Sequence, residues 1–291
     1  MQLIFTTFIA LVAFAGNSVL CRLALGEQQI DAASFTIIRV LSGALTLFVL
    51  LALSRNSSKA SSDTEDHAAG SWPAAIALFI YAVCFSYAYI SLDTATGALI
   101  LFGMVQLTMI VHALFKQHRL STKEWIGFVL ALLGLVYLLL PQASAPSLFG
   151  AALMSLSGVA WAYYTLAGKS QSAPLAATAY NFLRCVPLVA LLFVPLMFSS
   201  TVVLTEQGIM LAILSGSVTS GIGYAIWYVA LKQLSVIQAG VLQLLVPVFA
   251  AVGGIIFANE MISLQLAVSS ALILGGILLV VISKRVDVKT D

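Results

Sequence analysis

The sequence predicts an all-α integral membrane protein of ten transmembrane helices, arranged as two inverted five-helix repeats. Three observations predict it: the composition, ten long apolar runs, and self-similarity between the two halves. Hydrophobic residues make up 61% of the 291 positions, charged residues make up 8%, and the mean hydropathy is +1.07. Soluble domains carry about 25% charged residues. Because so little polar material is left to cover a soluble surface, the chain is expected to lie in lipid.

A membrane-spanning helix needs about 20 mostly apolar residues, and ten segments meet this condition. They are Leu3–Leu25, Ser34–Leu53, Trp72–Ile90, Thr94–Phe115, Trp125–Leu140, Leu148–Gly168, Ala176–Phe198, Gly208–Leu231, Leu234–Ala258 and Leu264–Ser283. Transmembrane strands would alternate in polarity over about ten residues. These runs are continuous, so they predict helices. Prolines inside two of them, at Pro187, Pro195 and Pro247, are expected to kink the helix.

The distribution of Lys and Arg predicts the orientation, because cytoplasmic loops are enriched in both. With the N-terminus inside, one side of the membrane carries only Arg22. The other side carries Arg55, Lys59, Lys116, Arg119, Lys123, Lys169, Lys232, Lys284, Arg285 and Lys289. We therefore expect a multi-pass protein of the cell (inner) membrane with both termini in the cytoplasm.

The two halves of the chain resemble each other, which divides it into repeats at 1–141 and 142–291. A shift of 145 positions places Arg39 on Arg184, and a shift of 141 places Ala98 on Ala239. The arginine pair is the informative match, since arginine is rare within spans. Because each half holds an odd number of spans, the second repeat must be inverted. Inverted repeats are typical of secondary transporters, whose substrate sites lie near the bilayer midplane.

Several motifs resemble the EamA family of the drug/metabolite transporter superfamily. The stretch Phe14-Ala-Gly-Asn-Ser, followed by Cys21-Arg-Leu-Ala-Leu and Ser34-Phe-Thr-Ile-Ile-Arg39, is similar to its first two helices. Gly158-Val-Ala-Trp161-Ala-Tyr-Tyr164 is similar to the start of its second repeat, and Pro247-Val-Phe-Ala, Asn259-Glu260 and Gly275-Gly276 to its last two helices.

The resemblance implies an exporter of small metabolites, frequently amino acids, and the inverted repeats predict that it works by alternating access. The chain departs from the family pattern at Phe14, where the family often has Trp. In the first repeat, Gln106 and Arg119 stand where the second repeat has Pro247 and Glu260.

Polar side chains within the spans are the first candidates for substrate binding. Arg39 could attract a substrate carboxylate, or it could bond to helix-end carbonyls or extend to the headgroups. Asn17, Gln106 and Gln243 lie near mid-depth. Their amides could hold a zwitterionic ligand or link helices to one another.

Aromatic side chains at mid-depth are the second set of candidates. Interfacial belts account for aromatic residues at the ends of spans, but not for those at the centre. The central set suits a largely apolar cavity with a few polar anchors, although ordinary helix packing would also use it. Its members are Phe14, Tyr81, Trp161, Tyr164 and Tyr224.

Acidic residues are missing from the interior of the spans. Proton-driven carriers usually need an intramembrane carboxylate or a chain of histidines, so we expect facilitated diffusion or exchange. The nearest acids fall at span ends or in loops, at Asp93, Glu124, Glu206 and Glu260.

Other classes of protein find little support. No nucleotide-binding, metal-ligand or hydrolase motif occurs, so we expect neither an enzyme nor a cofactor. The predicted partners are a small-molecule substrate and the lipid bilayer, with a homo-oligomer left open and nucleic acid excluded by the small net charge of +2. Two alternatives remain open at this point: an exporter of cationic drugs or amines on the same fold, and a polytopic sensor or channel.

Overall fold

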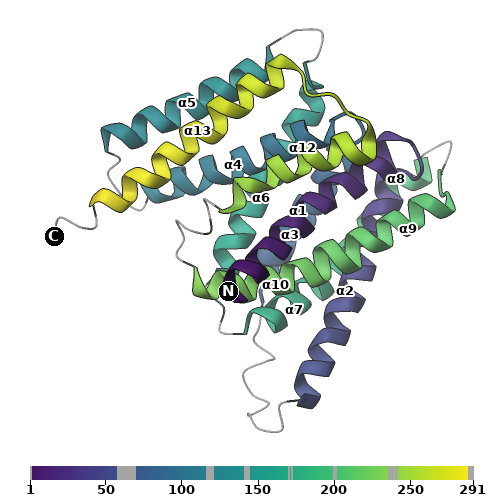
Figure 1. Ribbon diagram of the computed structural model, residues 1–291. Helices are drawn as coiled ribbons and strands as arrows, with labels where there is room; N and C mark the ends of the chain where they lie inside the picture. The colour runs from purple at the N-terminus through teal and green to yellow at the C-terminus, as the bar shows by residue number, and fades with distance from the viewer. Residues whose placement is uncertain are drawn as a thin grey trace.

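The computed structural model describes residues 2–57, 70–115, 121–140, 145–169, 171, 173–198, 202–234, 239 and 242–287 (Figure 1). The first half contains five helices, as predicted. They are α1 (Gln2–Gly26), α2 (Ala32–Ser57), α3 (Trp72–Ala88), α4 (Thr94–Phe115) and α5 (Thr122–Leu139). Polar residues set where two of them begin. Ser71 accepts a hydrogen bond from the Ala74 backbone at the start of α3, and Ser121 and Glu124 form a capping box at the start of α5.

The second half contains interrupted helices. It is built from α6 (Leu148–Lys169), α7 (Pro174–Val189), η2 (Ala190–Leu192), α8 (Phe193–Phe198), α9 (Glu206–Leu214), η3 (Ser215–Ile222), α10 (Gly223–Gln233), α12 (Leu245–Ala258) and α13 (Leu264–Asp287). The seventh span is divided into α7, η2 and α8 around Pro187 and Pro195, as expected of proline inside a helix. Pro247 follows a turn at Leu244 that separates helical residues 242–243 from α12.

The eighth span is one continuous helix of three parts. α9 and α10 have α-helical geometry, and η3 between them is a π-helix of eight residues. Across the described residues the only bridge outside helices joins Ile30 to Leu204, so the all-α prediction is confirmed. Six described helical segments are by themselves long and apolar enough to cross a membrane, and three shorter ones are also apolar.

Equivalent helices of the two halves make equivalent contacts, each with helices of the other half. α1 packs against α12, and its counterpart α6 packs against α4. In the same way α3 packs against α6, while α1 packs against the helix of α9, η3 and α10. Figure 1 shows α5 and α13, the last span of each half, running side by side. They approach closely at Gly127 and Gly276, where a Cβ on either residue would meet backbone of the other helix.

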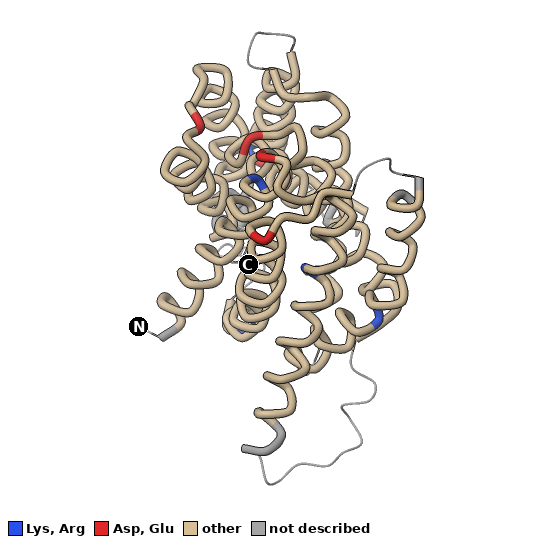
Figure 2. Tube along the Cα trace, turned by 90° about the vertical axis from the view of Figure 1, so that its right-hand side faces the viewer, with Lys and Arg blue, Asp and Glu red and all other residues tan. Residues whose placement is uncertain are grey.

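The two ends of the helix bundle differ in their charged contacts. At one end Arg22 forms ion pairs with Asp93 at 3.0 Å and with Glu260 at 3.1 Å, and the Thr94 backbone donates to Glu260 at 2.9 Å. We call this end the Arg22 side, and the opposite end, where α6 and α10 finish, the Lys232 side. Through the bundle charged residues are sparse (Figure 2). Among the basic residues used to predict orientation, Lys59, Lys116, Arg119 and Lys289 lie outside the described residues.

Candidate substrate-binding site

Arg39 lies on α2, eight residues into the helix, and is only 2% exposed. Its guanidinium donates to three hydroxyls. Nη2 lies 3.1 Å from the Tyr81 hydroxyl and 3.4 Å from that of Tyr224, and Nε lies 3.3 Å from Ser220 Oγ. Among the described residues, the side chain bonds to hydroxyls rather than to helix-end carbonyls, and it is buried rather than extended to the surface.

The positive charge of Arg39 is not balanced by an acid in the described part of the chain. Its hydrogen-bond partners are neutral, and the rings of Tyr81 and Phe85 lie 5.3 Å and 5.0 Å from the guanidinium carbon. Nη1 is buried and has no hydrogen-bond partner among the described residues. A charge buried without a counterion is costly, and cation–π contacts offset only part of that cost. The arrangement therefore favours an anionic group arriving beside Arg39.

Asn17 of α1 hydrogen-bonds to both α3 and η3. Its Nδ2 donates to the Tyr81 hydroxyl at 3.4 Å. Its Oδ1 accepts from Ser215 Oγ at 2.6 Å and from Thr219 Oγ1 at 3.1 Å. The amide thus fixes Tyr81 on α3 relative to η3 across three helices.

The π-helix explains why η3 can present so many polar groups to the centre. Ser215, Thr219 and Ser220 all face the Asn17–Arg39 network from one short segment. Gly216 lets η3 lie directly against α2, because a Cβ there would overlap the Arg39 carbonyl. π-Helical turns occur frequently at functional sites.

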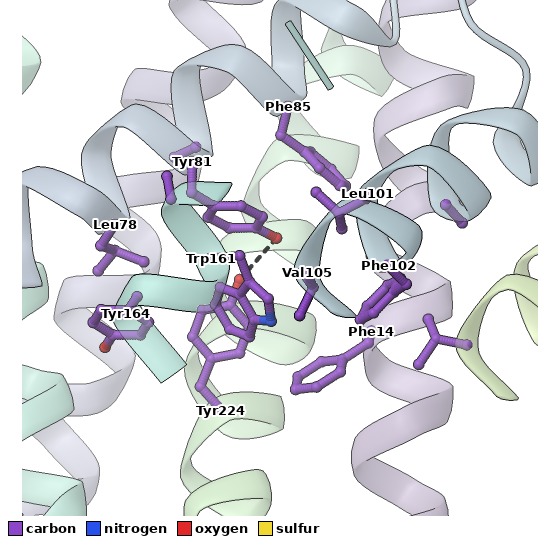
Figure 3. Packing of buried hydrophobic residues seen from close by; sticks show 14 of the residues in the cluster. Phe14, Leu78, Tyr81, Phe85, Leu101, Phe102, Val105, Trp161, Tyr164 and Tyr224 are labelled. Carbon is purple, nitrogen blue, oxygen red and sulfur yellow. Dashed lines mark hydrogen bonds between the residues drawn. The ribbon is translucent and has the colours of Figure 1, made fainter. Parts of the chain in front are cut away.

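Aromatic rings form the apolar wall of the same region (Figure 3). The Trp161 ring centroid lies 4.8 Å from that of Tyr81 and 4.9 Å from that of Tyr224, with Tyr164 at 5.6 Å. Phe14 packs edge-on against Trp161 at 5.7 Å. In this conformation none of these rings is more than 5% exposed, so the centre is closed and a ligand enters only when helices separate.

The two halves of the chain meet at Tyr81 and Tyr224. Their hydroxyls lie 3.1 Å apart. The two residues are 143 positions apart, a value between the shifts of 145 and 141 that relate the neighbouring spans. This is the spacing expected of equivalent positions in the two repeats. Arg39 breaks this symmetry, because Arg184 is only half-buried and lies 6.0 Å from the Tyr180 ring instead.

Comparison with known proteins agrees with this architecture. The sequence profile of the EamA-like transporter family matches residues 1–140 and, a second time, residues 148–282. The chain belongs to the EamA-like transporter family. The predicted family and the predicted fold class, ten helices in two five-helix repeats, are thereby confirmed.

Relatives of this EamA-like transporter come from bacteria and archaea. An uncharacterized protein of Pseudomonas aeruginosa is 49% identical over 94% of this chain and 92% of its own length. An uncharacterized transporter of Archaeoglobus fulgidus is 31% identical over 60% of this chain and 62% of its own. The uncharacterized transporter YwfM of Bacillus subtilis is 26% identical over 97% and 95%. The chain is therefore a multi-pass membrane transporter.

A solved structure supports the same fold. A crystal structure that covers 94% of this chain and 97% of its own superposes with a TM-score of 0.63 at 19% sequence identity. At that identity the likeness concerns the fold alone.

The structure brings seven of the nine predicted site residues together. They are Phe14, Asn17, Arg39, Tyr81, Trp161, Tyr164 and Tyr224. The other two, Gln106 and Gln243, are buried on α4 and just before α12, two helices that pack against each other. The hydrogen bonds around Arg39 come instead from α1, α2, α3 and the eighth span.

Sequence reasoning missed four residues of this arrangement. Ser215, Thr219 and Ser220 hold Asn17 and Arg39, and Phe85 stacks on the guanidinium. The sequence could have indicated the first three, because Ser215–Gly221 consists mostly of small and hydroxyl residues inside an apolar span. Nothing in the sequence distinguished Phe85 from its many apolar neighbours.

Proposed function

We propose that this EamA-like transporter exports small metabolites that carry a carboxylate, above all amino acids, across the cytoplasmic membrane by alternating access. The observation that carries the proposal is Arg39, a buried guanidinium with neutral partners and an unpartnered Nη1. Arginine binds carboxylates through charge-assisted hydrogen bonds, often two at once. A substrate carboxylate would supply the anion that the described residues around Arg39 do not.

The remaining groups suit the rest of such a substrate. Trp161, Tyr224 and Phe14 offer aromatic surface to an apolar side chain. The Tyr224 hydroxyl accepts one hydrogen bond, from Arg39, and can accept a second from a substrate ammonium. We infer that Asn17 acts on the substrate through Tyr81, because its Oδ1 is already shared by two hydroxyls of η3.

We propose that transport is driven by the substrate gradient, through exchange or facilitated diffusion, and not by a proton gradient. Acids in the described part of the chain lie at helix ends, and Asp31 directly precedes α2, the helix that carries Arg39. Glu124 is in the first turn of α5, and Asp93 and Glu260 are held by Arg22. A cationic drug or amine has no carboxylate to pair with Arg39, so its positive charge would be repelled by the guanidinium. For this reason the amine alternative is disfavoured.

Counterflow in proteoliposomes tests the proposal. Vesicles loaded with unlabelled amino acids are assayed for uptake of the labelled compound without a pH gradient, with a panel of amines in parallel. Saturable counterflow of amino acids is expected. Counterflow of amines alone, or none with folded and inserted protein, would overturn the assignment. Saturation also separates a carrier from a channel.

In the same assay, the Arg39→Gln variant tests the role of Arg39 itself. Arg184→Gln is the matched control from the other repeat. We expect the first variant to raise the half-saturating substrate concentration at least about tenfold, the loss expected for a hydrogen bond to a charged group. The second should stay near the wild-type value. Equal effects of the two substitutions would contradict a special role for Arg39.

A further inference from the structure

Two facing stripes of side chains lead from the Arg39 region toward the Lys232 side. On α6 the stripe consists of Trp161, Tyr164, Thr165 and Gly168. On α10 it consists of Tyr224, Trp227, Tyr228 and Leu231. Both stripes follow the spacing i, i+3, i+4, i+7, which places residues on one face of a helix. They meet where the Trp161 and Tyr224 rings lie 4.9 Å apart and where those of Tyr164 and Tyr228 lie 6.1 Å apart.

Apart from the Tyr224 hydroxyl, which bonds to Arg39 and Tyr81, the side-chain polar atoms of these stripes make no hydrogen bond of normal geometry to the described residues, although the Tyr164 hydroxyl lies close to Thr178, Asn181 and Tyr228. Within the described chain, five buried atoms here lack a hydrogen bond: Trp161 Nε1, Tyr164 Oη, Thr165 Oγ1, Trp227 Nε1 and Tyr228 Oη. Each of these residues is at most 5% exposed. Leaving a buried hydrogen-bond donor without an acceptor destabilises the folded state. A concentration of such donors on two facing stripes is therefore unusual for simple helix packing, which would use apolar residues.

A cavity adjoins the stripes on the Lys232 side. It has a volume of about 130 Å³ and is lined by Gly168, Gln171, Pro174, Tyr228, Leu231 and Lys232. Tyr228 belongs both to this cavity and to the stripe, and its ring lies against the α6 backbone at Gly168, where a Cβ would overlap it. Tyr228 therefore separates the cavity from the Arg39 region.

We propose that these stripes form a second, transient carboxylate-binding site through which the substrate passes between the Lys232 side and Arg39. Every unpartnered atom there can donate a hydrogen bond, and the indole nitrogens can only donate, so the complementary ligand group is an acceptor. The ammonium of Lys232 at the cavity would attract the same anionic group. The site rests on the proposed function, since it serves the same carboxylate that Arg39 receives.

In this site the Tyr164 and Tyr228 hydroxyls hold the carboxylate while the Tyr228 ring turns away from Gly168. Rotation of that ring joins the cavity to the Trp161–Tyr224 contact. The site thus selects carboxylates before the substrate reaches Arg39. On the Arg22 side, by contrast, the ion pair of Arg22 with Glu260 links the two halves of the chain, and Arg22 also pairs with Asp93 of its own half.

Tyr164→Phe and Tyr228→Phe test the proposal, because each removes one hydroxyl and keeps the ring. Tyr163→Phe is the matched control, since Tyr163 is adjacent on α6 but 51% exposed. The measurement is amino-acid transport in membrane vesicles of both orientations. We expect Tyr228→Phe to raise the half-saturating concentration about tenfold for substrate offered at the Lys232 side, and about twofold at most for substrate offered at the Arg22 side. Tyr163→Phe should change neither value.

The outcomes separate this proposal from the function on which it rests. If wild-type protein transports no carboxylate, the proposed function is overturned and the second site with it. If the wild type transports but both variants match Tyr163→Phe, only the second site is overturned, and the stripes pack helices. Equal loss at both sides together with a lower melting temperature would show a structural role and would also overturn it. Loss confined to the Lys232 side at an unchanged melting temperature supports the proposal.

Discussion

At the scale of single residues, the centre of this transporter is organised around hydroxyl groups. The Tyr81 hydroxyl lies within hydrogen-bonding distance of Arg39, Asn17 and Tyr224, which come from three different helices. It is the point at which both repeats and the buried charge meet. The polar network therefore has one shared centre, so losses at Tyr81 and at its partners should not be additive.

Tyr81→Phe should weaken both folding and transport. The substitution keeps the ring against Trp161 but removes the nearer of the two acceptors of Arg39 Nη2, and with it a hydrogen bond to a charged group. We expect a loss of about 1.5–3 kcal/mol in stability, measured as a lower melting temperature of the purified protein in detergent. Tyr163→Phe on the exposed face of α6 is the control. A Tyr81→Phe protein as stable as this control would show that the network contributes nothing.

The sequence allowed the individual residues of the centre to be predicted, but not their pairing. Arg39, Asn17 and Tyr224 were recognisable because polar or aromatic side chains at mid-depth of a span are unusual. Asn17 and Ser215, however, lie 198 positions apart. Their hydrogen bond depends on how α1 packs against the eighth span. Gln106 and Gln243 are also buried amides at mid-depth, but the Arg39 guanidinium bonds to Tyr81, Tyr224 and Ser220 instead. Residue type and depth alone therefore did not predict which amides join the network.

At the scale of elements, the π-helix η3 is the feature that the sequence did not predict. A run of apolar residues indicates a span, but hydrogen-bond spacing within a helix is set by its neighbours. Here Gly216 lies against the Arg39 backbone and Gly221 lies near Thr46, both on α2. This close approach places Ser220 within reach of Arg39.

Gly216→Ala should therefore destabilise the protein by about 1–3 kcal/mol, the usual cost of overpacking. Its Cβ would overlap the Arg39 carbonyl and the Ser42 side chain. Gly275→Ala is the matched control, because a Cβ at that helical glycine meets no atom within 4 Å. Thermal unfolding of the two variants in the same detergent checks the prediction, which fails if Gly216→Ala is as stable as Gly275→Ala.

At the scale of the whole molecule, composition and the internal repeat predicted the fold. The match of the Arg39 and Arg184 positions indicated a repeat, and the odd number of spans in each half implied that the second copy is inverted. Only Arg39 became part of the buried centre. The link between the halves on the Arg22 side was not predicted. Asp93 and Glu260 were recognised only as acids at span ends, and their shared partner Arg22 lies far from both in the sequence.

Glu260→Gln should loosen this link more than Asp93→Asn does. Glu260 accepts hydrogen bonds from Arg22 and from the Thr94 backbone, and its side chain is 12% exposed, whereas that of Asp93 is 58% exposed. Exposed ion pairs contribute about 0–1 kcal/mol, and partly buried ones cost more to break. The melting temperature is expected to fall more for Glu260→Gln, and the reverse order would contradict this description.

Topology reporters fused to the two ends check the predicted orientation. With ten spans and the Lys and Arg bias, both fusions should report from the cytoplasm. A reporter active outside at either end would overturn the proposed orientation and with it the direction of transport.

The most direct test of the central claim, that Arg39 receives a substrate carboxylate, is competition during counterflow. Proteoliposomes transporting a labelled aromatic amino acid are challenged with three unlabelled analogues: the amino acid itself, its amide, and the amine that lacks the carboxyl group. We predict that the amino acid competes fully, that the amide and the amine compete at least about tenfold more weakly, and that Arg39→Gln abolishes this difference while Arg184→Gln preserves it. Equal competition by all three compounds in the wild type would contradict the claim.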